Sequence, residues 1–419
     1  MANSLPKYYT KTLKNGLEVI AIPMKNGSGV ISTNIYYKVG SRNEVMGKSG
    51  IAHMLEHMSF KSTKNLKAGE FDKIVKSFGG VDNASTGFDY TTYFIKSSSK
   101  NLKKSLELFA ELMQNLLLKD EEFQVERDVV AEERRVRTDN PPLGYMYFRL
   151  FNTHYVRHSY HWTPIGFMGD ILSWTIDDIR DFYNKYYQPN NAILIVSGDI
   201  DKDEVFKEAK EIFENIPNRT EVPKYTIKEP KRDGKIRNII HKDNNRVDTI
   251  AIAYPIPNFE HKDQVVLSAI SEILSSGKSS RLYRELIDKK RLANVIYGYN
   301  LELKDEGIFL FMAMANPNIK IENLEKAIHK EIDRLKSGDV TKEELEKVKI
   351  NTKADFIFSL ENSSKVNSLF GSYFARGNIE PLLEYEENLD KITPEMVTEV
   401  AKKYFDDNLS TTIILKKEE

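Results

Sequence analysis

The chain has 419 residues, of which 40% are hydrophobic, and it is longer than a single core usually grows, so two or more domains are expected. Its 61 Lys and Arg nearly balance its 62 Asp and Glu, which argues against nucleic acid as a partner. The absence of cysteine excludes disulfides, thiolate metal sites and a Cys nucleophile, so a metal site must use His, Asp or Glu.

The N-terminal sequence MANSLPKYYTKTLKNGLEVIAIP lacks the apolar stretch of a signal peptide. No window approaches the roughly 18 continuous apolar residues that a membrane-spanning helix needs. We therefore expect no membrane span and a cytoplasmic protein, or a periplasmic one if a leader has been removed.

Two predicted strands, at 16–23 and 31–40, precede a predicted helix with the sequence GIAHMLEHMSFKST at 50–63. His53 and His57 lie four residues apart, so they share a helix face and can present their imidazoles to one ion, with Glu56 beside it. This H-x-x-E-H pattern is the reverse of the H-E-x-x-H motif of thermolysin-type zinc peptidases. The alternative is an ordinary apolar helix with two hydrogen-bonded histidines.

The next elements are VDNASTGFDYTTYF at 81–94, which reads as a turn followed by an alternating strand, and EEFQVERDVVAEERRVR at 121–137, a periodic acidic helix. A catalytic zinc site usually has three protein ligands. Glu126 and Glu133 are two helical turns apart on one face. We take Glu133 as the third ligand and Glu126 as a supporting carboxylate that orients a histidine. Taken alone, this helix fits a solvated charged face equally well.

Three further histidines, His154, His158 and His161, also have ligand-like spacing in THYVRHSYHW. No glutamate that could serve as a base accompanies them. We interpret this cluster as loop and partner contacts.

A repeat at a fixed offset of 218 residues relates the two halves of the chain. The segment at 175–199 reads as an amphipathic helix and an apolar strand, TIDDIRDFYNKYYQPNNAILIVSGD. It matches the segment at 393–417, TPEMVTEVAKKYFDDNLSTTIILKK. The strand around Tyr36 likewise falls on the strand around Tyr254. One architecture is therefore predicted to occur twice.

Each predicted half opens with paired strands, continues with helices and closes with a helix and a strand. This order favours an α+β fold of two homologous domains, each a largely antiparallel sheet packed with helices, related by internal duplication. The segment at 215–234 has three prolines, many charges and little periodicity, as is typical of a linker. We expect a zinc-binding domain at 1–218, a linker at 219–234 and a second domain at 235–419 without metal ligands.

The repeat also sharpens the interpretation of the histidine motif. Adding 218 to the numbers of His53, Glu56 and His57 gives Ser271, Leu274 and Ser275, in the segment AISEILSSG. Because the sister helix does without such side chains, packing alone does not require them in the first copy.

These residues resemble the inverzincin peptidases of the pitrilysin and insulinase family, specifically the short members of mitochondrial-processing-peptidase type. The resemblance covers essentially the whole chain, and its most specific segments are VGSRNEVMGKSGIAHMLEHMSFKST, GGVDNASTGFDYTTYF and ERDVVAEERR. It implies one Zn²⁺ per chain, held by His53, His57 and Glu133, with Glu56 as the catalytic base and Glu126 in support.

The same resemblance implies that VDNASTGFDYTTYF contains an edge strand that pairs with extended substrate, with Asn83 and Ala84 as peptide-binding positions. An ordinary edge strand is the alternative.

One departure from the family pattern lies in the second domain. Self-sufficient members carry an Arg and a Tyr there, seven residues apart, that stabilise the oxyanion. In SSRLYRELIDKKRLANVIYGY the matching positions are Ile287 and Asn294, neither of which offers a cationic or phenolic donor. Nearby side chains of suitable type require a shift of frame: Arg284, Arg291, Tyr297 and Tyr299.

We therefore expect a zinc-dependent endopeptidase that hydrolyses peptides or unfolded segments by Glu-assisted attack of a zinc-bound water. We expect it to be the catalytic subunit of a two-chain clamshell, preferably a heterodimer whose partner supplies Arg and Tyr, with a homodimer as the alternative. The alternative function is a non-catalytic scaffold subunit of a larger complex.

Overall fold

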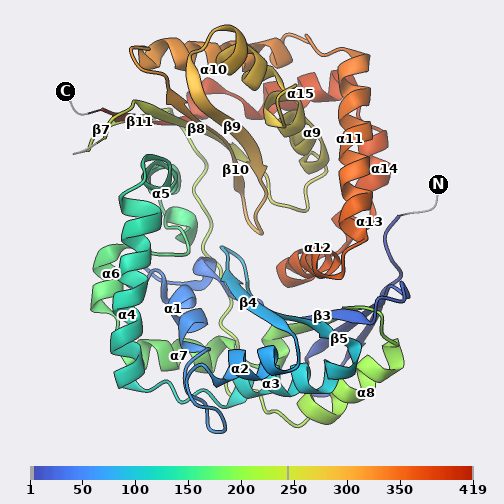
Figure 1. Ribbon diagram of the computed structural model, residues 1–419. Helices are drawn as coiled ribbons and strands as arrows, with labels where there is room; N and C mark the ends of the chain where they lie inside the picture. Colours follow the sequence, from blue (N-terminus) through green and yellow to red (C-terminus); the bar gives the residue numbers. More distant parts are fainter. Residues whose placement is uncertain (1–3, 243–244, 418–419) are drawn as a thin grey trace. The chain divides into compact units, whose positions relative to one another are not determined.

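The computed structural model describes residues 4–242 and 245–417, which form two compact units (Figure 1). Unit 1 holds the described residues up to Arg134, Trp162–Thr226 and Phe356–Leu382, and unit 2 holds Arg135–His161, Ile227–Asp355 and the described residues from Leu383. Each unit thus includes a segment from the other half of the sequence. The predicted division into 1–218, 219–234 and 235–419 concerns the repeat along the chain and stays a prediction.

Within the described residues, unit 1 contains one sheet of six strands in the order β1-β2-β6-β3-β5-β4. The strands are β1 (Tyr9–Thr12), β2 (Glu18–Pro23), β3 (Val30–Tyr37), β4 (Val81–Thr86), β5 (Thr91–Ser98) and β6 (Ala192–Gly198). The β2–β6 pair is parallel and the other pairs are antiparallel. The segment read as a turn from the sequence is therefore itself a strand, β4, at the free edge of the sheet.

Helices cover both faces of this sheet, so its central strands are apolar on both sides. Ile31 and Ile35 of β3 face the core that also includes residues of α1, α3 and α7, whereas Tyr36 faces a second cluster that includes Phe370 of α12. Figure 1 shows α12 on one side of β3 and β5, and α2 and α3 on the other. The helices of unit 1 are α1 (Ile51–Met58), α2 (Glu70–Ser77), α3 (Leu102–Gln114), α4 (Asp120–Arg134), α6 (Met168–Ser173), α7 (Ile176–Tyr186), α8 (Lys202–Phe213) and α12 (Ser363–Arg376).

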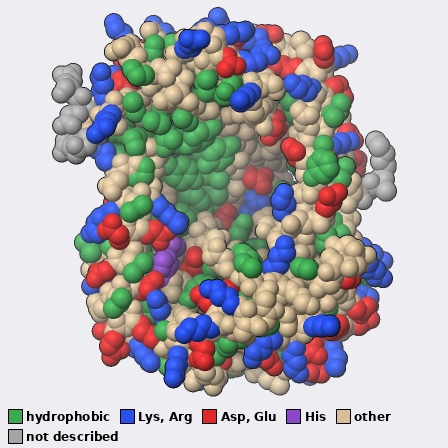
Figure 2. Space-filling view, viewed as in Figure 1, with side chains coloured by type: hydrophobic (Ala, Val, Ile, Leu, Met, Phe, Trp, Pro, Cys, Tyr) green, Lys and Arg blue, Asp and Glu red, His purple; other side chains and the backbone are tan. Residues whose placement is uncertain are grey.

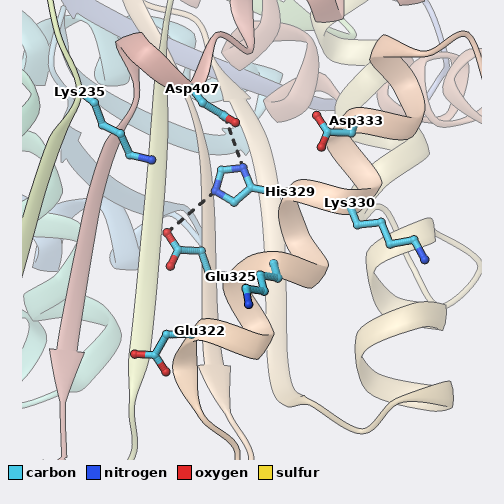
Figure 3. Close-up of a pocket in the computed structure, with 8 residues that line it drawn as sticks. Lys235, Glu322, Glu325, His329, Lys330, Asp333 and Asp407 are labelled. Carbon is cyan, nitrogen blue, oxygen red and sulfur yellow. Dashed lines mark ion pairs between the residues drawn. The ribbon is translucent and has the colours of Figure 1, made fainter.

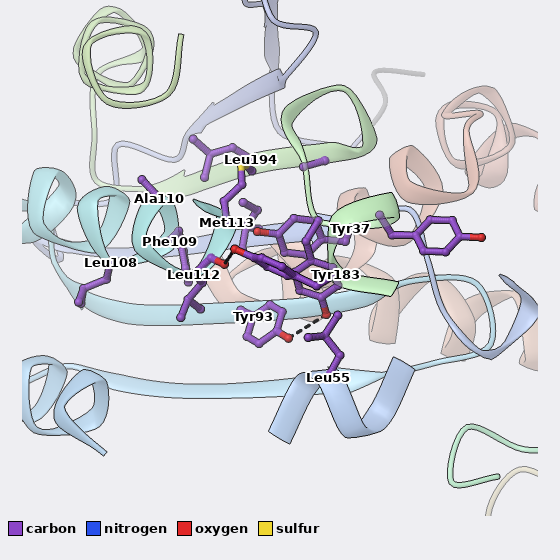
Figure 4. Packing of buried hydrophobic residues seen from close by; sticks show 14 of the residues in the cluster. Tyr37, Leu55, Tyr93, Leu108, Phe109, Ala110, Leu112, Met113, Tyr183 and Leu194 are labelled. Carbon is purple, nitrogen blue, oxygen red and sulfur yellow. Dashed lines mark hydrogen bonds between the residues drawn. The ribbon is translucent and has the colours of Figure 1, made fainter. Parts of the chain in front are cut away.

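A tyrosine-rich core lies beneath α1 (Figure 4). Leu55 of α1 is fully buried in it, and Tyr37 stacks on Tyr187 with ring centroids 3.9 Å apart. The buried Tyr93 hydroxyl lies 2.9 Å from the Tyr187 hydroxyl and 2.9 Å from Ser59 Oγ, just after α1 ends. The apolar face and the C-terminal end of α1 are therefore fixed by this core, which leaves the other face for polar groups.

Unit 2 repeats the arrangement with a sheet in the order β7-β11-β8-β10-β9. This matches β2-β6-β3-β5-β4 strand for strand, and its parallel pair, β7–β11, sits at the matching place. Its elements are β7 (Ile236–His241), β8 (Thr249–Ile256), β9 (Ala293–Leu301), β10 (Gly307–Ala315), β11 (Thr411–Lys416), α5 (Pro142–His154), α9 (Gln264–Ser275), α10 (Ile321–Lys336), α14 (Tyr385–Asp390) and α15 (Pro394–Tyr404). Two of the boundaries between the units fall within helices, α11 (Lys342–Leu360) and α13 (Glu380–Leu383).

The repeat extends to single residues. Glu18 pairs with Ile193 in the first parallel ladder and Ile236 pairs with Thr411 in the second, which is the 218-residue offset on both strands. The predicted fold class, α+β with two homologous and largely antiparallel sheets packed with helices, is confirmed.

Across the described residues, no helix combines the length and the apolar character that crossing a membrane requires.

Helix α12 is tied to the sheet of unit 1 by one asparagine and one close approach. Asn367 donates from Nδ2 to the Ser32 carbonyl and to Asn34 Oδ1, both at 2.8 Å. A Cβ added at Gly371 would lie 2.2 Å from the Tyr36 ring. The small residue therefore allows the helix to lie directly on the tyrosine.

This contact generates a stability prediction. Gly371→Ala should lower the free energy of unfolding by about 1–3 kcal/mol, because the added methyl overpacks against Tyr36. Gly169→Ala in α6 is the control, because its added Cβ meets nothing within 4 Å. Urea denaturation of both variants checks this; an equal midpoint for the two would contradict the packing described for α12.

Candidate metal centre

Helix α1 carries three polar residues on the side opposite its buried face. Ile51, Ala52, Met54, Leu55 and Met58 are buried, while the residues at the remaining positions of the motif are only partly exposed. His53, Glu56 and His57 therefore lie along one side of an otherwise apolar helix, as the 3.6-residue period requires. Figure 2 shows histidine atoms reaching the surface beside acidic groups, over the region of α1 and α4.

The third member of the cluster comes from the C-terminal end of α4. Glu133 Oε2 lies 3.3 Å from His57 Nε2 and 3.7 Å from His53 Nε2. One ligand atom from each of the three residues can be chosen so that all lie within 4.8 Å of one another. Within 4–242 and 245–417, this is the one group of three or more such side chains with that geometry. Two imidazole nitrogens and a carboxylate oxygen fit the donor set that zinc prefers at catalytic sites.

Glu126, two helical turns before Glu133 on α4, contacts the far side of the His57 ring. Its Oε1 lies 2.8 Å from His57 Nδ1, and its Oε2 pairs with Lys61 Nζ at 2.5 Å. With a proton on Nδ1, the His57 ring directs Nε2 toward Glu133. Glu126 was predicted from the sequence to orient a histidine. Lys61, four residues after His57, was not predicted to take part.

These contacts shift the pKa values of His57 and Glu126 in opposite directions. Burial lowers the pKa of His57, but the hydrogen bonds and negative charges of Glu126 and Glu133 outweigh burial and raise it to about 9. Burial also acts to raise the pKa of Glu126, but the hydrogen bonds from His57 and Lys61 prevail and lower it. The acidic surroundings thus favour a cation between the three side chains, whether a proton or a metal ion.

Glu56 lies beside this cluster and contacts the edge strand. Thr86 at the end of β4 donates a hydrogen bond from Oγ1 to Glu56 Oε2. This contact links the carboxylate to the strand predicted to bind substrate. Nothing local in the sequence indicates Thr86, because the contact depends on how β4 packs against α1.

Among the described residues, only β5 pairs with strand β4, which therefore has an open edge. The Ala84 N–H donates to Asn83 Oδ1 at 2.9 Å. Asn83 is exposed, and Ala84 packs partly against the core. A main-chain donor of this strand is therefore bonded to a side chain of the same strand.

The equivalent helix of unit 2, α9, uses its polar positions in another way. Ser271 Oγ bonds to the Gly298 carbonyl at 3.2 Å, and Ser275 Oγ accepts from the Gly298 N–H at 2.6 Å. These serines, which stand where the first copy has its histidines, anchor strand β9 to the helix. Leu274, at the position of Glu56, is fully buried.

The second unit also shows what occupies the positions where relatives are expected to have Arg and Tyr. Ile287 packs against the core of unit 2, and Asn294 is exposed on β9. Tyr297 donates to Met312 Sδ at 3.2 Å. Burial, and then the neighbouring Tyr299, raise the pKa of the Tyr147 hydroxyl.

Two other histidines of the chain have structural partners in unit 2. His154 is buried at the end of α5, with Nδ1 3.0 Å from Thr411 Oγ1, and His158 is buried with Nε2 3.0 Å from Asp305 Oδ2. His154 thus lies at the end of a helix rather than in a loop, whereas His158 lies in the turn after α5; a role in partner contacts stays a prediction. Their spacing is set by the turn after α5, where buried imidazoles satisfy neighbouring polar groups.

A shallow pocket on unit 2 contains His329 between two carboxylates (Figure 3). Its Nδ1 lies 3.3 Å from Asp407 Oδ1 and its Nε2 4.0 Å from Glu325 Oε1. Glu325 is paired with Arg237 at 2.5 Å, and Tyr254 donates to Asp407 at 2.8 Å. Both carboxylates beside His329 are therefore bonded to other side chains of unit 2.

Comparison with known families identifies two matching regions. Residues 19–155 match the family described as insulinase (peptidase family M16), and residues 173–352 match the domain described as peptidase M16 inactive domain. The second match extends into the predicted second domain, 235–419, in which we expect no metal ligands.

Individual relatives match over nearly the whole chain. The zinc protease PqqE of Helicobacter pylori is 55% identical over 98% of this chain and 93% of its own length. The beta subunit of the mitochondrial-processing peptidase of Bos taurus is 26% identical over 96% of this chain and 83% of that protein.

Two solved structures show the same fold. The crystal structure of a protease from Helicobacter pylori superposes with a TM-score of 0.97 at 56% identity, covering 98% of this chain and 100% of that one. The first half of the periplasmic protease PqqL from Escherichia coli gives a TM-score of 0.78 at 22% identity, over 100% of this chain and 94% of that one. From these matches and the donor set on α1 and α4, the chain belongs to peptidase family M16 and is a zinc metallopeptidase.

Proposed function

We propose that the chain is an endopeptidase that holds one zinc ion with His53, His57 and Glu133 and hydrolyses peptides or unfolded segments. The convergence of these three side chains from two helices carries the proposal. Zinc at a site of this kind polarises a carbonyl and lowers the pKa of a bound water from 15.7 to about 7. The remaining steps fall to side chains of the protein.

Glu56 is the proposed general base. It stands beside the metal ligands rather than among them, so its carboxylate can take a proton from the attacking water and return it to the leaving amine. The hydrogen bond from Thr86 fixes one oxygen of Glu56. Glu126, paired with Lys61, keeps His57 in the tautomer that offers Nε2.

Substrate binding is proposed at the open edge of β4. An extended peptide can add there as a further strand through main-chain hydrogen bonds, which gives affinity with little sequence selectivity. In this proposal the Ala84 N–H leaves Asn83 Oδ1 and donates to the peptide. Because Thr86 joins the same strand to Glu56, a peptide on this edge lies next to the base.

The oxyanion donors are proposed to come from a second chain. Ile287 and Asn294 supply neither charge nor a phenol, and the Tyr297 hydroxyl is bonded to Met312 within unit 2. A heterodimer with a related subunit that carries Arg and Tyr would complete the site. A relative named as the beta subunit of mitochondrial-processing peptidase supports this by analogy, because its name implies at least one other subunit.

The base assignment predicts a separation of zinc binding from cleavage. Glu56→Gln should retain one zinc per chain and lower cleavage of an unfolded peptide by about 10²–10⁴-fold, because proton transfer is lost. Metal analysis and a fluorogenic peptide assay, on tagged chain purified from its native host, measure both. Glu132→Gln on α4 removes an equal charge outside the cluster and should change neither. Loss of zinc in Glu56→Gln, or full activity, would contradict the role.

The edge-strand proposal predicts a binding defect. Ala84→Pro removes one main-chain donor, and since such a bond contributes about 0.5–1.5 kcal/mol, kcat/KM should fall roughly threefold to tenfold while zinc content stays the same. Ala84→Gly keeps the N–H and should lose less. Equal kcat/KM for the two variants would argue that peptide does not pair at this edge.

The partner proposal predicts that the purified chain alone is nearly inactive. Adding the co-purifying subunit should raise cleavage by about 10²–10³-fold, the contribution of an oxyanion donor. Titration of that subunit into the peptide assay measures the gain. An isolated chain already as fast as the mixture would remove the need for a partner.

A further inference from the structure

A buried glutamate outside the motif holds the start of the metal-binding helix. Glu44 follows the short 3-10 helix Ser41–Asn43 and is 3% exposed. Its Oε2 accepts from the Gly50 N–H at 2.8 Å and from Trp162 Nε1 at 2.6 Å, and its Oε1 accepts from the Ala52 N–H at 2.8 Å. Both oxygens are therefore occupied by donors at the N-terminus of α1 and by one indole.

Such a group is costly for the fold to bury. Burial raises the pKa of the Glu44 carboxyl to about 8, against the opposing effect of its three hydrogen bonds. A short polar residue at the helix start could cap α1 without burial. The cap position is instead Gly50, in a left-handed conformation with φ of 84°, and it makes no side-chain cap. The N–H groups at the start of α1 are thus capped by the buried side chain of Glu44, which lies outside the helix.

The segment Trp162–Phe167 connects this cap to the end of α4. Trp162 donates to Glu44, and the Phe167 N–H donates to Ser49 Oγ at 2.8 Å. Between them, the Gly166 carbonyl accepts a hydrogen bond from Arg134, the residue directly after Glu133. A Cβ at Gly166 would lie 2.5 Å from the Ser49 backbone, so the segment is wedged against the start of α1.

From these contacts we infer that Glu44 is a positioning residue for the metal centre: it fixes the N-terminus of α1 against Trp162–Phe167, and through Arg134 against Glu133. The inference rests on the proposed zinc site. It explains why His53 and His57, on one helix, meet a carboxylate from another helix in a fixed geometry. Outer groups that orient ligands commonly contribute 10–100-fold to metal affinity.

The test compares zinc affinity and coordination in folded variants. Glu44→Ala removes all three acceptor contacts, and Glu44→Gln retains one oxygen as the conservative rescue. Glu229→Ala in unit 2 is the matched control, because Glu229 also accepts three hydrogen bonds, here all from backbone N–H groups, those of Val156, Arg157 and His158. Zinc dissociation constants come from chelator competition, and the visible spectrum of the Co²⁺-substituted protein reports ligand geometry.

Glu44→Ala should bind zinc about 10–100-fold more weakly with an altered Co²⁺ spectrum, Glu44→Gln should be intermediate, and Glu229→Ala should stay within twofold of the parent. If Glu44→Ala does not fold, Trp162→Phe, which removes one donor, should still weaken zinc binding by about threefold or more. A folded Glu44→Ala, or in its absence Trp162→Phe, with parental affinity and spectrum overturns the inference. A parent chain that binds no zinc would overturn the proposed function instead.

Discussion

The site depends on one constraint: two helices must pack so that the narrow polar side of α1 meets the C-terminal end of α4. The apolar side of α1 is fixed by the tyrosine-rich core, in which Leu55 is fully buried. The opposite side can then hold two imidazoles and a carboxylate only partly exposed to water. Groups in such a setting interact more strongly than on an open surface, which is why Glu126 and Glu133 hold the His57 pKa high.

The duplicated fold shows how the same scaffold serves two purposes. In unit 1, α1 presents His53 and His57 outward, and Thr86 links the edge strand to Glu56. In unit 2, the matching serines of α9 bind the backbone of β9 and hold the edge strand to the helix. The sheet order and the parallel pair are unchanged between the copies. The same helix positions thus carry a structural contact in one copy and proposed metal ligands in the other.

Much of this could be predicted from the sequence, because the relevant signals are local or periodic. The i, i+4 histidines, the two-turn spacing of Glu126 and Glu133, and the 218-residue repeat each follow from regular geometry. The local pattern of VDNAST, polar and exposed, was read as a turn, whereas its ladder with β5 makes it a strand, and only the family resemblance implied an edge strand there.

Other features depend on contacts between residues far apart in the chain. Glu44 and Trp162 meet across 118 positions, and Thr86 reaches Glu56 across 30. The exchange of α5 and α12 between the sequence halves could not be predicted either, since an amphipathic helix does not specify which sheet it covers.

The most direct test of this account is X-ray diffraction at the zinc absorption edge from crystals of the chain grown with zinc. We expect one anomalous peak, bonded to Nε2 of His53, Nε2 of His57 and the Glu133 carboxylate at about 2.0–2.2 Å, with Glu56 outside bonding distance. A peak at another set of side chains, or no peak between α1 and α4, would contradict it.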